Sequence, residues 1–404
     1  MKPFSSRLPR LGTENAFAVI TKAKKFEREV LQPQGKHLVY LQIGEPGFDT
    51  PENINKAAIR AIKDNQTHYT ATPGIHELRE AVARESSRNS CMPYEAEDVV
   101  IVPGGKPVMF YMIQALIDPG DEVIIPNPGY PIYGSVTEFL GGKVVPIQLK
   151  EENNFNFSAE ELERCITPKT KLIIVNSPQN PTGGVYTKEL LGQIAEIAIR
   201  HDLWVLSDEI YDKIVHDGTH VSITSFAGMP ERTVLLNGCS KAYAMTGYRV
   251  GWSVTKNREM AIALERLACN DVSCVNTMAQ FAALEALTGS VTQKAVDKMV
   301  IEYRQRRDLM VKLVNEIPGM RCHSPKGAFY LMVNVRRLLD ALKITGAEFC
   351  DRVMKEANVL ILPGTVFGLF GDDFVRFSYV STEEKIKEGL ARIRDWIQKI
   401  ALPL

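Results

Sequence analysis

Six short apolar runs recur through the middle of the chain, and each ends abruptly at polar, Gly or Pro residues. Each run is too short for a buried helix and is rich in Val, Ile and Leu, which is typical of strands covered on both faces. We therefore predict a mainly parallel sheet. The runs are VVIV (99–102), EVIIP (122–126), KLIIV (171–175), LWVL (203–206), TVLL (233–236) and RVGWSV (249–254).

Helical patterns separate these runs. In TKELLGQIAEIAIRHD (187–202), Leu190, Leu191, Ile194 and Ile197 share one face of the expected helix. Strands that alternate with such helices form α/β layer folds, with helices on both faces of the sheet. We expect this architecture for the larger part of the chain.

The C-terminal quarter has a different pattern. Residues 291–317 form one long helical pattern that stops at Pro318 and Gly319. GAFYLMVNV and DFVRFSYV then read as strands, and STEEKIKEGLARIRDWIQKI as a last helix capped by Ser381 or Thr382. We expect a smaller α+β domain over 291–404, a large domain over 46–290, and an N-terminal arm over 1–45 that joins the small domain.

Charge, cysteine and histidine usage narrow the class of protein. Lys plus Arg equals Asp plus Glu at 48 each, which does not favour a nucleic-acid partner. No apolar stretch is long enough for a membrane span, and the first residues carry basic residues without an apolar run, so we expect neither a span nor a secretory signal. Seven cysteines without a CxxC motif favour reduced thiols and a cytoplasmic location. His216 and His220 lack further ligands nearby in the sequence, so we predict no metal site.

Polar clusters follow five of the apolar runs. In an open parallel sheet, ligands bind outside the carboxyl ends of the strands, so these clusters are expected to meet at one crevice. They are PGGKP (103–107), PNPGYP (126–131), NSPQNPTG (176–183), SDEIY (207–211) and NGCSKAY (237–243).

The residue types in these clusters suit one kind of cofactor. Gly104 and Gly105 precede Pro107 at an expected helix start, where bare backbone N–H groups can hold a phosphate and Arg249 can add charged donors. The pattern is neither a Walker loop nor GxGxxG. A lysine that can form an imine, an aspartate for a ring nitrogen and a tyrosine for a ring oxygen complete the groups that pyridoxal 5'-phosphate requires.

Three of these motifs carry a family resemblance. NSPQNPTG, SDEIY and SKAYAMTGYRVGW (240–252), in this order and spacing, resemble the class I/II pyridoxal-phosphate aminotransferases of fold type I. The resemblance extends from GEPGFDTP (44–51) to VRFSYVSTEE (375–384). It implies a large cofactor-binding domain, a homodimer, and ping-pong transfer of an amino group from an L-amino acid to a 2-oxo acid.

The resemblance implies roles around the cofactor ring. Lys241 would bind the cofactor covalently and then shuttle the substrate proton. Asp208 would keep the ring nitrogen protonated, and Tyr211 and Asn180 would bond the ring oxygen. Tyr130 aligns with the aromatic residue that stacks on the ring.

It also implies the phosphate site. The amides of Gly105 and Lys106, with the Arg249 side chain, would bind the phosphate, and Ser240 is a further candidate. Many relatives carry a phosphate-binding serine three residues before the lysine, but here that position is Gly238.

Three more positions concern the substrate and the dimer. Arg376 matches the arginine that binds the substrate α-carboxylate, and the Gly44 backbone and Asn180 lie beside it in the family. Tyr69 matches a tyrosine that reaches the phosphate of the neighbouring subunit.

The substrate class has more than one interpretation. Lys106 stands where some aspartate-type members bind the distal carboxylate, which favours aspartate or glutamate. Glu14 opposes this, because an acid near that carboxylate would repel it or pair with Lys106. Phe17, Tyr69 and Tyr130 would instead suit aromatic or broad neutral substrates. A carbon–sulfur lyase would use the same apparatus. An effector-binding domain of a transcription regulator is disfavoured, because the resemblance begins within the first fifty residues.

Overall fold

A twisted sheet of seven strands forms the centre of the larger unit. The computed structural model describes residues 2–12 and 15–400, except the side chains of 15–18. Within these residues the strand order is β2-β8-β7-β6-β5-β3-β4, and only β8 runs antiparallel to its neighbours. The strands are β2 (Val99–Val102), β3 (Glu122–Asn127), β4 (Lys143–Gln148), β5 (Thr170–Asn176), β6 (Trp204–Asp208), β7 (Thr233–Gly238) and β8 (Gly251–Val254).

All six predicted runs are strands of this sheet. The seventh strand, β4, was not predicted from the sequence. It lies at the sheet edge, and all of its residues but one are partly buried or exposed. It also contains Pro146, which a strand tolerates mainly at an edge. Its pattern therefore lacks the uniform apolar character that identified the central strands.

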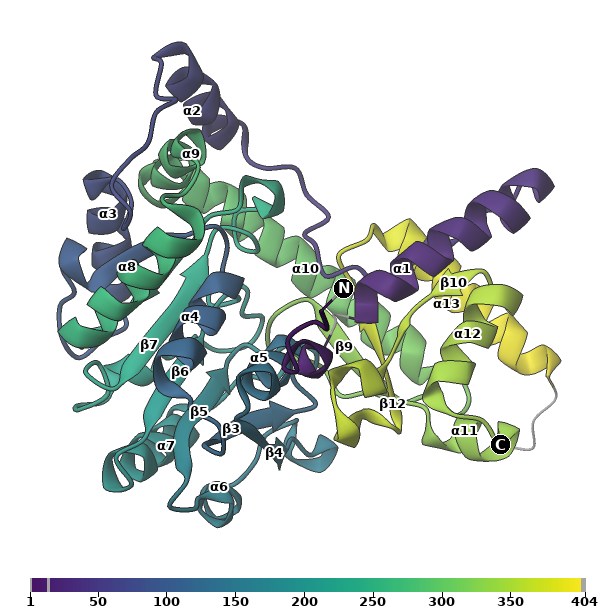
Figure 1. Ribbon diagram of the computed structural model, residues 1–404. Helices are drawn as coiled ribbons and strands as arrows, with labels where there is room; N and C mark the ends of the chain where they lie inside the picture. Colours follow the sequence, from purple (N-terminus) through teal and green to yellow (C-terminus); the bar gives the residue numbers. More distant parts are fainter. Residues whose placement is uncertain (1, 13–14, 401–404) are drawn as a thin grey trace.

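Helices cover both faces of the sheet, as the alternating pattern predicted (Figure 1). α4, α5 and α8 pack on one face, and α6 and α7 on the other. α7 begins after Thr187, whose side chain accepts a hydrogen bond from Leu190 N. The helices of this unit are α2 (Glu52–Lys63), α3 (His76–Ser87), α4 (Lys106–Leu116), α5 (Ile132–Leu140), α6 (Ala159–Cys165), α7 (Lys188–Arg200), α8 (Arg258–Val272) and α9 (Thr277–Thr288).

A smaller unit follows α9. Its antiparallel sheet has the order β11-β12-β9, with β9 at Tyr330–Asn334, β11 at Leu362–Pro363 and β12 at Phe374–Ser378. Thr382, and not Ser381, caps the last helix. The helices here are α10 (Thr292–Asn315), α11 (Arg336–Leu342), α12 (Gly346–Glu356) and α13 (Glu383–Lys399).

The start of the chain packs on this smaller unit. β1 (Val39–Tyr40) pairs in parallel with β10 (Val359–Leu360), and α1 (Asn15–Phe26) lies beside α12 in Figure 1. Lys22 on α1 forms an ion pair with Asp351 on α12 at 2.5 Å. The N-terminal segment thereby adds a strand and a helix to elements more than 300 residues later.

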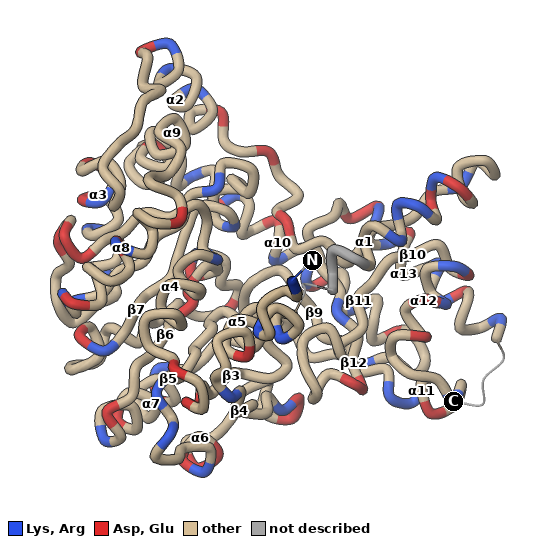
Figure 2. The backbone as a smooth tube through the Cα atoms, in the orientation of Figure 1, with Lys and Arg blue, Asp and Glu red and all other residues tan. Residues whose placement is uncertain are grey.

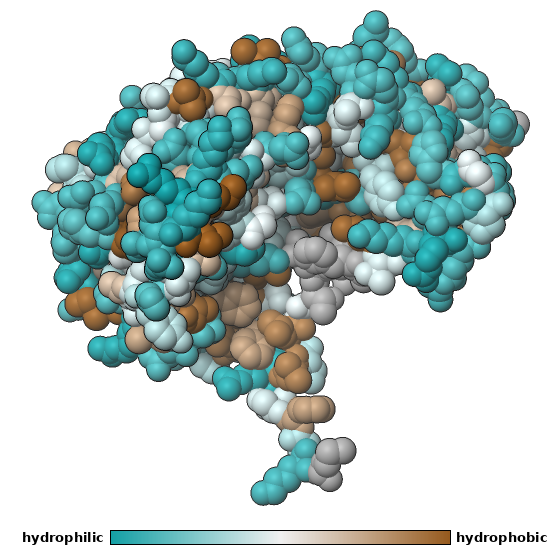
Figure 3. Space-filling view, turned by 90° about the horizontal axis from the view of Figure 1, so that it is seen from above, coloured by the Kyte–Doolittle hydropathy of each residue, from teal (hydrophilic) through white to brown (hydrophobic). Residues whose placement is uncertain are grey.

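The surface carries both signs of charge. Figure 2 shows acidic and basic residues interspersed over both units, without a segregated basic face. Viewed from above, the molecule is hollowed between the two units, and apolar residues lie on the walls of this hollow (Figure 3). No helix in the described ranges is both long enough and apolar enough to span a bilayer.

Candidate active site

One cavity of about 550 Å³ opens where the carboxyl ends of the parallel strands meet the smaller unit. Residues after β2, β3, β5, β6 and β7 contribute to its wall, because these five strands run in the same direction and end at the same edge. The predicted site residues that line it are Gly44, Gly105, Lys106, Tyr130, Asn180, Asp208, Tyr211, Ser240, Lys241, Arg249 and Arg376. The smaller unit also contributes Tyr330 and Phe367.

Lys241 lies in the turn that follows β7. Its Nζ donates a hydrogen bond to the Gly44 carbonyl oxygen at 2.6 Å and lies 6.0 Å from the centre of the Phe329 ring. The segment that contains Gly44 comes from the start of the chain. The amino group is therefore held at the meeting point of the two units, with its nitrogen at the cavity wall.

Asp208 is the last residue of β6 and is buried. One carboxylate oxygen accepts a hydrogen bond from the Tyr133 hydroxyl at 2.6 Å, and the other from Ile210 N at 3.2 Å. Burial raises the pKa of Asp208 to about 6, although both hydrogen bonds oppose the shift. A cationic ligand atom at this carboxylate would relieve the cost of the buried charge.

Tyr133 was not predicted from the sequence. It lies on α5, three residues after Tyr130, so the two side chains share a face of the chain, with ring centres 5.7 Å apart. This spacing is the signal that was available in PNPGYPIY. A buried tyrosine next to the predicted ring-stacking position is a candidate partner for a buried carboxylate.

A helix start and a guanidinium form a corner of the cavity. α4 begins at Lys106, and its N-cap Gly105 supplies no side-chain bond to the free N–H groups. Arg249 donates to the carbonyl oxygens of Thr246 at 3.0 Å and Pro103 at 3.4 Å. A Cβ at Gly104, where φ is +85°, would lie 2.1 Å from Arg249 Nη2. Only glycine allows this close approach, which leaves backbone N–H groups and a cation side by side.

Gly238 does not face this corner. A side chain there would meet Gly251 Cα and the Val250 carbonyl oxygen at 2.9 Å, because β7 and β8 are closely packed at this point. Close strand packing therefore favours a residue without a side chain at this position. Ser240 is buried and lines the cavity.

Arg376 lies on β12 and forms the opposite wall. Its Nη1 donates to Asn180 Oδ1 at 2.9 Å and its Nη2 to the Gln42 carbonyl oxygen at 2.7 Å. The guanidinium carbon lies 4.3 Å from the centre of the Tyr330 ring and 4.7 Å from that of Phe367. These contacts fix a planar, charged donor at the cavity, a geometry suited to a carboxylate.

Gln42 and Tyr330 were also not predicted. Gln42 lines the cavity with 1% exposure, and no hydrogen-bond partner for its side-chain amide lies among the described residues. The Tyr330 hydroxyl lies 2.8 Å from that of Tyr211. Burial, followed by the neighbouring Tyr330, raises the pKa of Tyr211 well above its ordinary value, so its hydroxyl keeps its proton.

Three predicted positions are not among the residues that line this cavity in the described structure. Tyr69 is 89% exposed and is not part of the cavity wall. Glu14 lies outside the described residues, as does the side chain of Phe17. Lys106 lines the cavity, and its Nζ is 5.9 Å from the centre of the Tyr130 ring.

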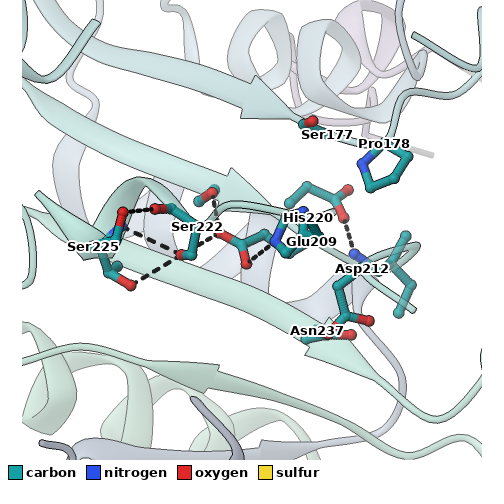
Figure 4. Close-up of polar contacts among 12 residues, drawn as sticks. Ser177, Pro178, Glu209, Asp212, His220, Ser222, Ser225 and Asn237 are labelled. Atoms are coloured by element: carbon teal, nitrogen blue, oxygen red, sulfur yellow. Dashed lines mark hydrogen bonds and ion pairs between the residues drawn. The ribbon is translucent and has the colours of Figure 1, made fainter. Parts of the chain in front are cut away.

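A second, smaller cavity of about 250 Å³ is lined by Glu209, Asp212, Lys213 and His220. Glu209 accepts hydrogen bonds from Ser207 at 2.8 Å and Ser222 at 2.6 Å, and pairs with His220 at 2.7 Å (Figure 4). No group of three or more His, Cys, Asp or Glu in the described part of the chain is arranged to hold a metal ion.

Comparisons with known proteins agree with this geometry. The family model for aminotransferase class I and II matches residues 36–393. The aspartate/prephenate aminotransferase of Thermus thermophilus is 39% identical over 97% of this chain and 98% of its own length. The aromatic-amino-acid aminotransferase 2 of Thermococcus litoralis is 38% identical over 88% of this chain and 90% of its own length.

A solved structure of a similar protein has the same fold. The aspartate aminotransferase of Rhizobium meliloti superposes with a TM-score of 0.92 at 34% identity and covers all of both chains. The fold and the lysine, aspartate and arginine of the cavity define an amino-group-transferring enzyme. The chain belongs to the class I and II aminotransferases.

Proposed function

We propose that this aminotransferase holds pyridoxal 5'-phosphate in the large cavity. The donor set fits each part of that cofactor: helix-start N–H groups and Arg249 for the phosphate, buried Asp208 for the ring nitrogen, and Tyr211 for the ring oxygen. When bound, the cofactor supplies an electrophilic aldehyde and an electron-withdrawing ring. The unusually close approach of Arg249 to bare Gly104 supports the phosphate assignment.

The chain's own residues would then transfer the substrate proton and hold the cofactor ring in place. Lys241 Nζ would bind the cofactor covalently and, once displaced by substrate, carry the proton from the substrate Cα. Asp208 would keep the ring nitrogen protonated. The Tyr211 hydroxyl and Asn180 would bond the ring oxygen, and Tyr130 would cover one ring face.

We infer that the donor is a dicarboxylic L-amino acid, aspartate or glutamate, with a 2-oxo acid as acceptor. Besides Lys241 and Arg249, which are assigned to the cofactor, two further cations, Arg376 and Lys106, line the same cavity, and this single observation carries the assignment. Arg376, Asn180 and the Gly44 backbone would bind the α-carboxylate and set the Cα–H bond across the ring plane. Lys106 would bind the distal carboxylate. The names of the Thermus thermophilus and Rhizobium meliloti relatives support this class.

An aromatic or broad neutral donor is the second candidate. Tyr130, Phe367 and Ile20 supply apolar surface to the same cavity, and the Thermococcus litoralis relative is named for aromatic amino acids. A carbon–sulfur lyase is a third. It would release ammonia and pyruvate from a sulfur amino acid without any 2-oxo acid acceptor.

We further propose a homodimer in the cytoplasm. Tyr69 is 89% exposed and lines neither of the two cavities described above, which supports a contact with the phosphate of a second copy. The seven cysteines, all within the described residues, are free thiols, which suits a reducing compartment.

An absorbance titration tests the function. The purified protein is loaded with pyridoxal phosphate, and its spectrum is recorded after separate additions of aspartate, glutamate, phenylalanine, alanine and arginine. We expect the visible band to move to the near ultraviolet with aspartate or glutamate and to return with 2-oxoglutarate. A response to phenylalanine alone would favour the aromatic class. The absence of any Lys241-dependent band would overturn the cofactor assignment.

A further inference from the structure

Tyr330 lies where the two units of the molecule meet. It is the first residue of β9 in the smaller unit, and only 1% of it is exposed. Its hydroxyl oxygen is 2.8 Å from the hydroxyl oxygen of Tyr211, which belongs to the larger unit. The two rings meet edge to face, with centres 5.8 Å apart. This hydrogen bond joins buried phenols across the boundary between the units.

The ring of the same side chain supports Arg376. The guanidinium carbon lies 4.3 Å from the ring centre, at the distance of a cation–π contact. Tyr330 therefore touches the arginine assigned to the substrate carboxylate with its ring, and the tyrosine assigned to the cofactor oxygen with its hydroxyl.

The position of the Tyr330 hydroxyl is tightly constrained. A Cβ built on Gly44 would lie 2.8 Å from the Tyr330 hydroxyl oxygen, closer than side chains tolerate. The Tyr330 backbone is paired with Ser378 on β12, and its ring packs on Phe329 at 4.8 Å. Backbone pairing and the missing Gly44 side chain thus place the hydroxyl against Tyr211.

We propose that Tyr330 is a positioning residue that acts on the cofactor through Tyr211; the inference rests on the proposed function. One hydrogen lies in the hydrogen bond between the two hydroxyl oxygens, and either phenol can supply it. If Tyr211 gives its own hydrogen to the cofactor ring oxygen, the hydrogen between the phenols must come from Tyr330. A phenol that accepts a hydrogen bond is a stronger donor, because hydrogen bonds in a chain polarise one another. Tyr330 therefore strengthens the bond that Tyr211 makes to the ring oxygen.

The test uses the loaded enzyme and the pH midpoint of its visible absorption band. A weaker hydrogen bond leaves the ring oxygen more basic, so it holds the nearby imine proton more firmly and the midpoint rises. Tyr330→Phe keeps the ring below Arg376 and removes only the hydroxyl. We expect an upward shift smaller than that of Tyr211→Phe. In a Tyr211→Phe background, Tyr330→Phe should add no shift.

Tyr303→Phe is the matched control. It removes another buried hydroxyl from the same aromatic cluster, 5.5 Å from Phe329 between ring centres, and should leave the midpoint at the wild-type value. If Tyr330→Phe folds poorly, Gly44→Ala replaces it in the test. The added methyl group would displace the Tyr330 hydroxyl, so we expect the same upward shift of the midpoint.

The outcomes separate this inference from the proposed function. Equal shifts in the wild-type and Tyr211→Phe backgrounds, or no shift with Tyr330→Phe, would overturn the role of Tyr330 while the band itself upholds the cofactor site. A wild-type protein without a titrating band would overturn both. Tyr330→Leu additionally removes the ring, so we expect it to weaken binding of a dicarboxylate analogue such as maleate by roughly two- to fivefold relative to Tyr330→Phe.

Discussion

The buried charge of Asp208 lowers the free energy of unfolding of the cofactor-free protein. Its carboxylate is buried at the end of β6, where it accepts two hydrogen bonds and lies within the electrostatic influence of Lys241. Its pKa of about 6 shows that burial outweighs both donors. In the proposed function, the protonated ring nitrogen of the cofactor would offset this loss of stability when it binds.

We predict that Asp208→Asn stabilises the cofactor-free protein at pH 8. Between pH about 4 and 6 the folded chain binds a proton at Asp208 that the unfolded chain has lost, so the free energy of unfolding falls as the pH rises through this window. We expect a gain of about 1–2 kcal/mol at pH 8 and little change at pH 4. Urea unfolding of both proteins at the two pH values measures it. If the free energies of unfolding of Asp208→Asn and the wild type differed by the same amount at both pH values, this would contradict a raised pKa of Asp208.

Lys106 tests the substrate class. If its ammonium binds the distal carboxylate, Lys106→Ala should raise the KM for aspartate by about tenfold or more and leave that for phenylalanine within about twofold. Steady-state kinetics with both donors decides this. Lys169→Ala, a surface lysine far from the cavity wall, is the control. An equal rise for both donors would show that Lys106 does not read the distal carboxylate.

The sequence predicted the site residues that lie in motifs, and it did not predict the cavity residues that lie outside any motif. Lys241, Asp208 and Arg376 lie in recognisable motifs in or directly after strands, and the structure brings them to one cavity. Tyr330 and Gln42 reach the same cavity from segments far away in the sequence, so only the packing of the two units reveals them. Tyr133 could have been inferred from its spacing to Tyr130.

Among the elements, the loop after β6 joins the two units. Residues 211–220 carry Tyr211 at one end, and His216 is buried in the middle. Its Nε2 lies 2.9 Å from the Ala328 carbonyl oxygen and 3.0 Å from the Tyr379 hydroxyl, both in the smaller unit. Burial, and then the nearby Arg307, lower the pKa of His216 to about 4. The imidazole therefore stays neutral in the folded protein at neutral pH.

We predict that this histidine makes the fold sensitive to acid. The unfolded chain takes up a proton as the pH falls below 6.5, and the folded chain only near pH 4, so stability is lost across this window. His216→Gln should therefore lose less stability than the wild type between pH 7 and pH 5, by about 1–2 kcal/mol. Chemical unfolding at both pH values measures the difference. His76→Gln, at an exposed position, should behave as the wild type does.

Elements with a uniform apolar pattern were predictable, and an edge strand with mixed exposure was not. The six predicted runs, including β2 at the opposite edge of the sheet, are strands because both of their faces are covered. β4 has one partner and mixed exposure, so its sequence does not distinguish a strand from a loop.

For the whole molecule, the cavity lies between two units that pack along a wide boundary. Arg307 on α10 pairs with Asp217 of the larger unit and bonds the Pro325 carbonyl oxygen at 3.0 Å. We retain a boundary near residue 290 as a proposal, with α10 as the element that connects the units. The proposed homodimer also belongs to the scale of the whole molecule, because the role proposed for the exposed Tyr69 is at the site of a second copy.

We predict that subunits with different defects complement each other. Tyr69→Phe should lower cofactor affinity by about tenfold or more, because a hydrogen bond to a charged phosphate is lost. Lys241→Ala abolishes its own site. In an equal mixture that exchanges subunits, each mixed dimer regains one intact site, so activity should reach about a quarter of the wild-type value. Refolding the two variants together and assaying turnover checks this, and no recovery would place Tyr69 in its own subunit's site.

The pairing of β1 with β10 has a consequence for synthesis. Val39 leaves the ribosome long before Val359, its partner. At ~5–20 residues per second the delay is on the order of tens of seconds. During that time the first strand and its buried neighbours Leu38 and Leu41 have no sheet to join. The nascent chain can assemble the wall that carries Asp208 and Lys241 first, while the wall that carries Arg376 must await the end of translation.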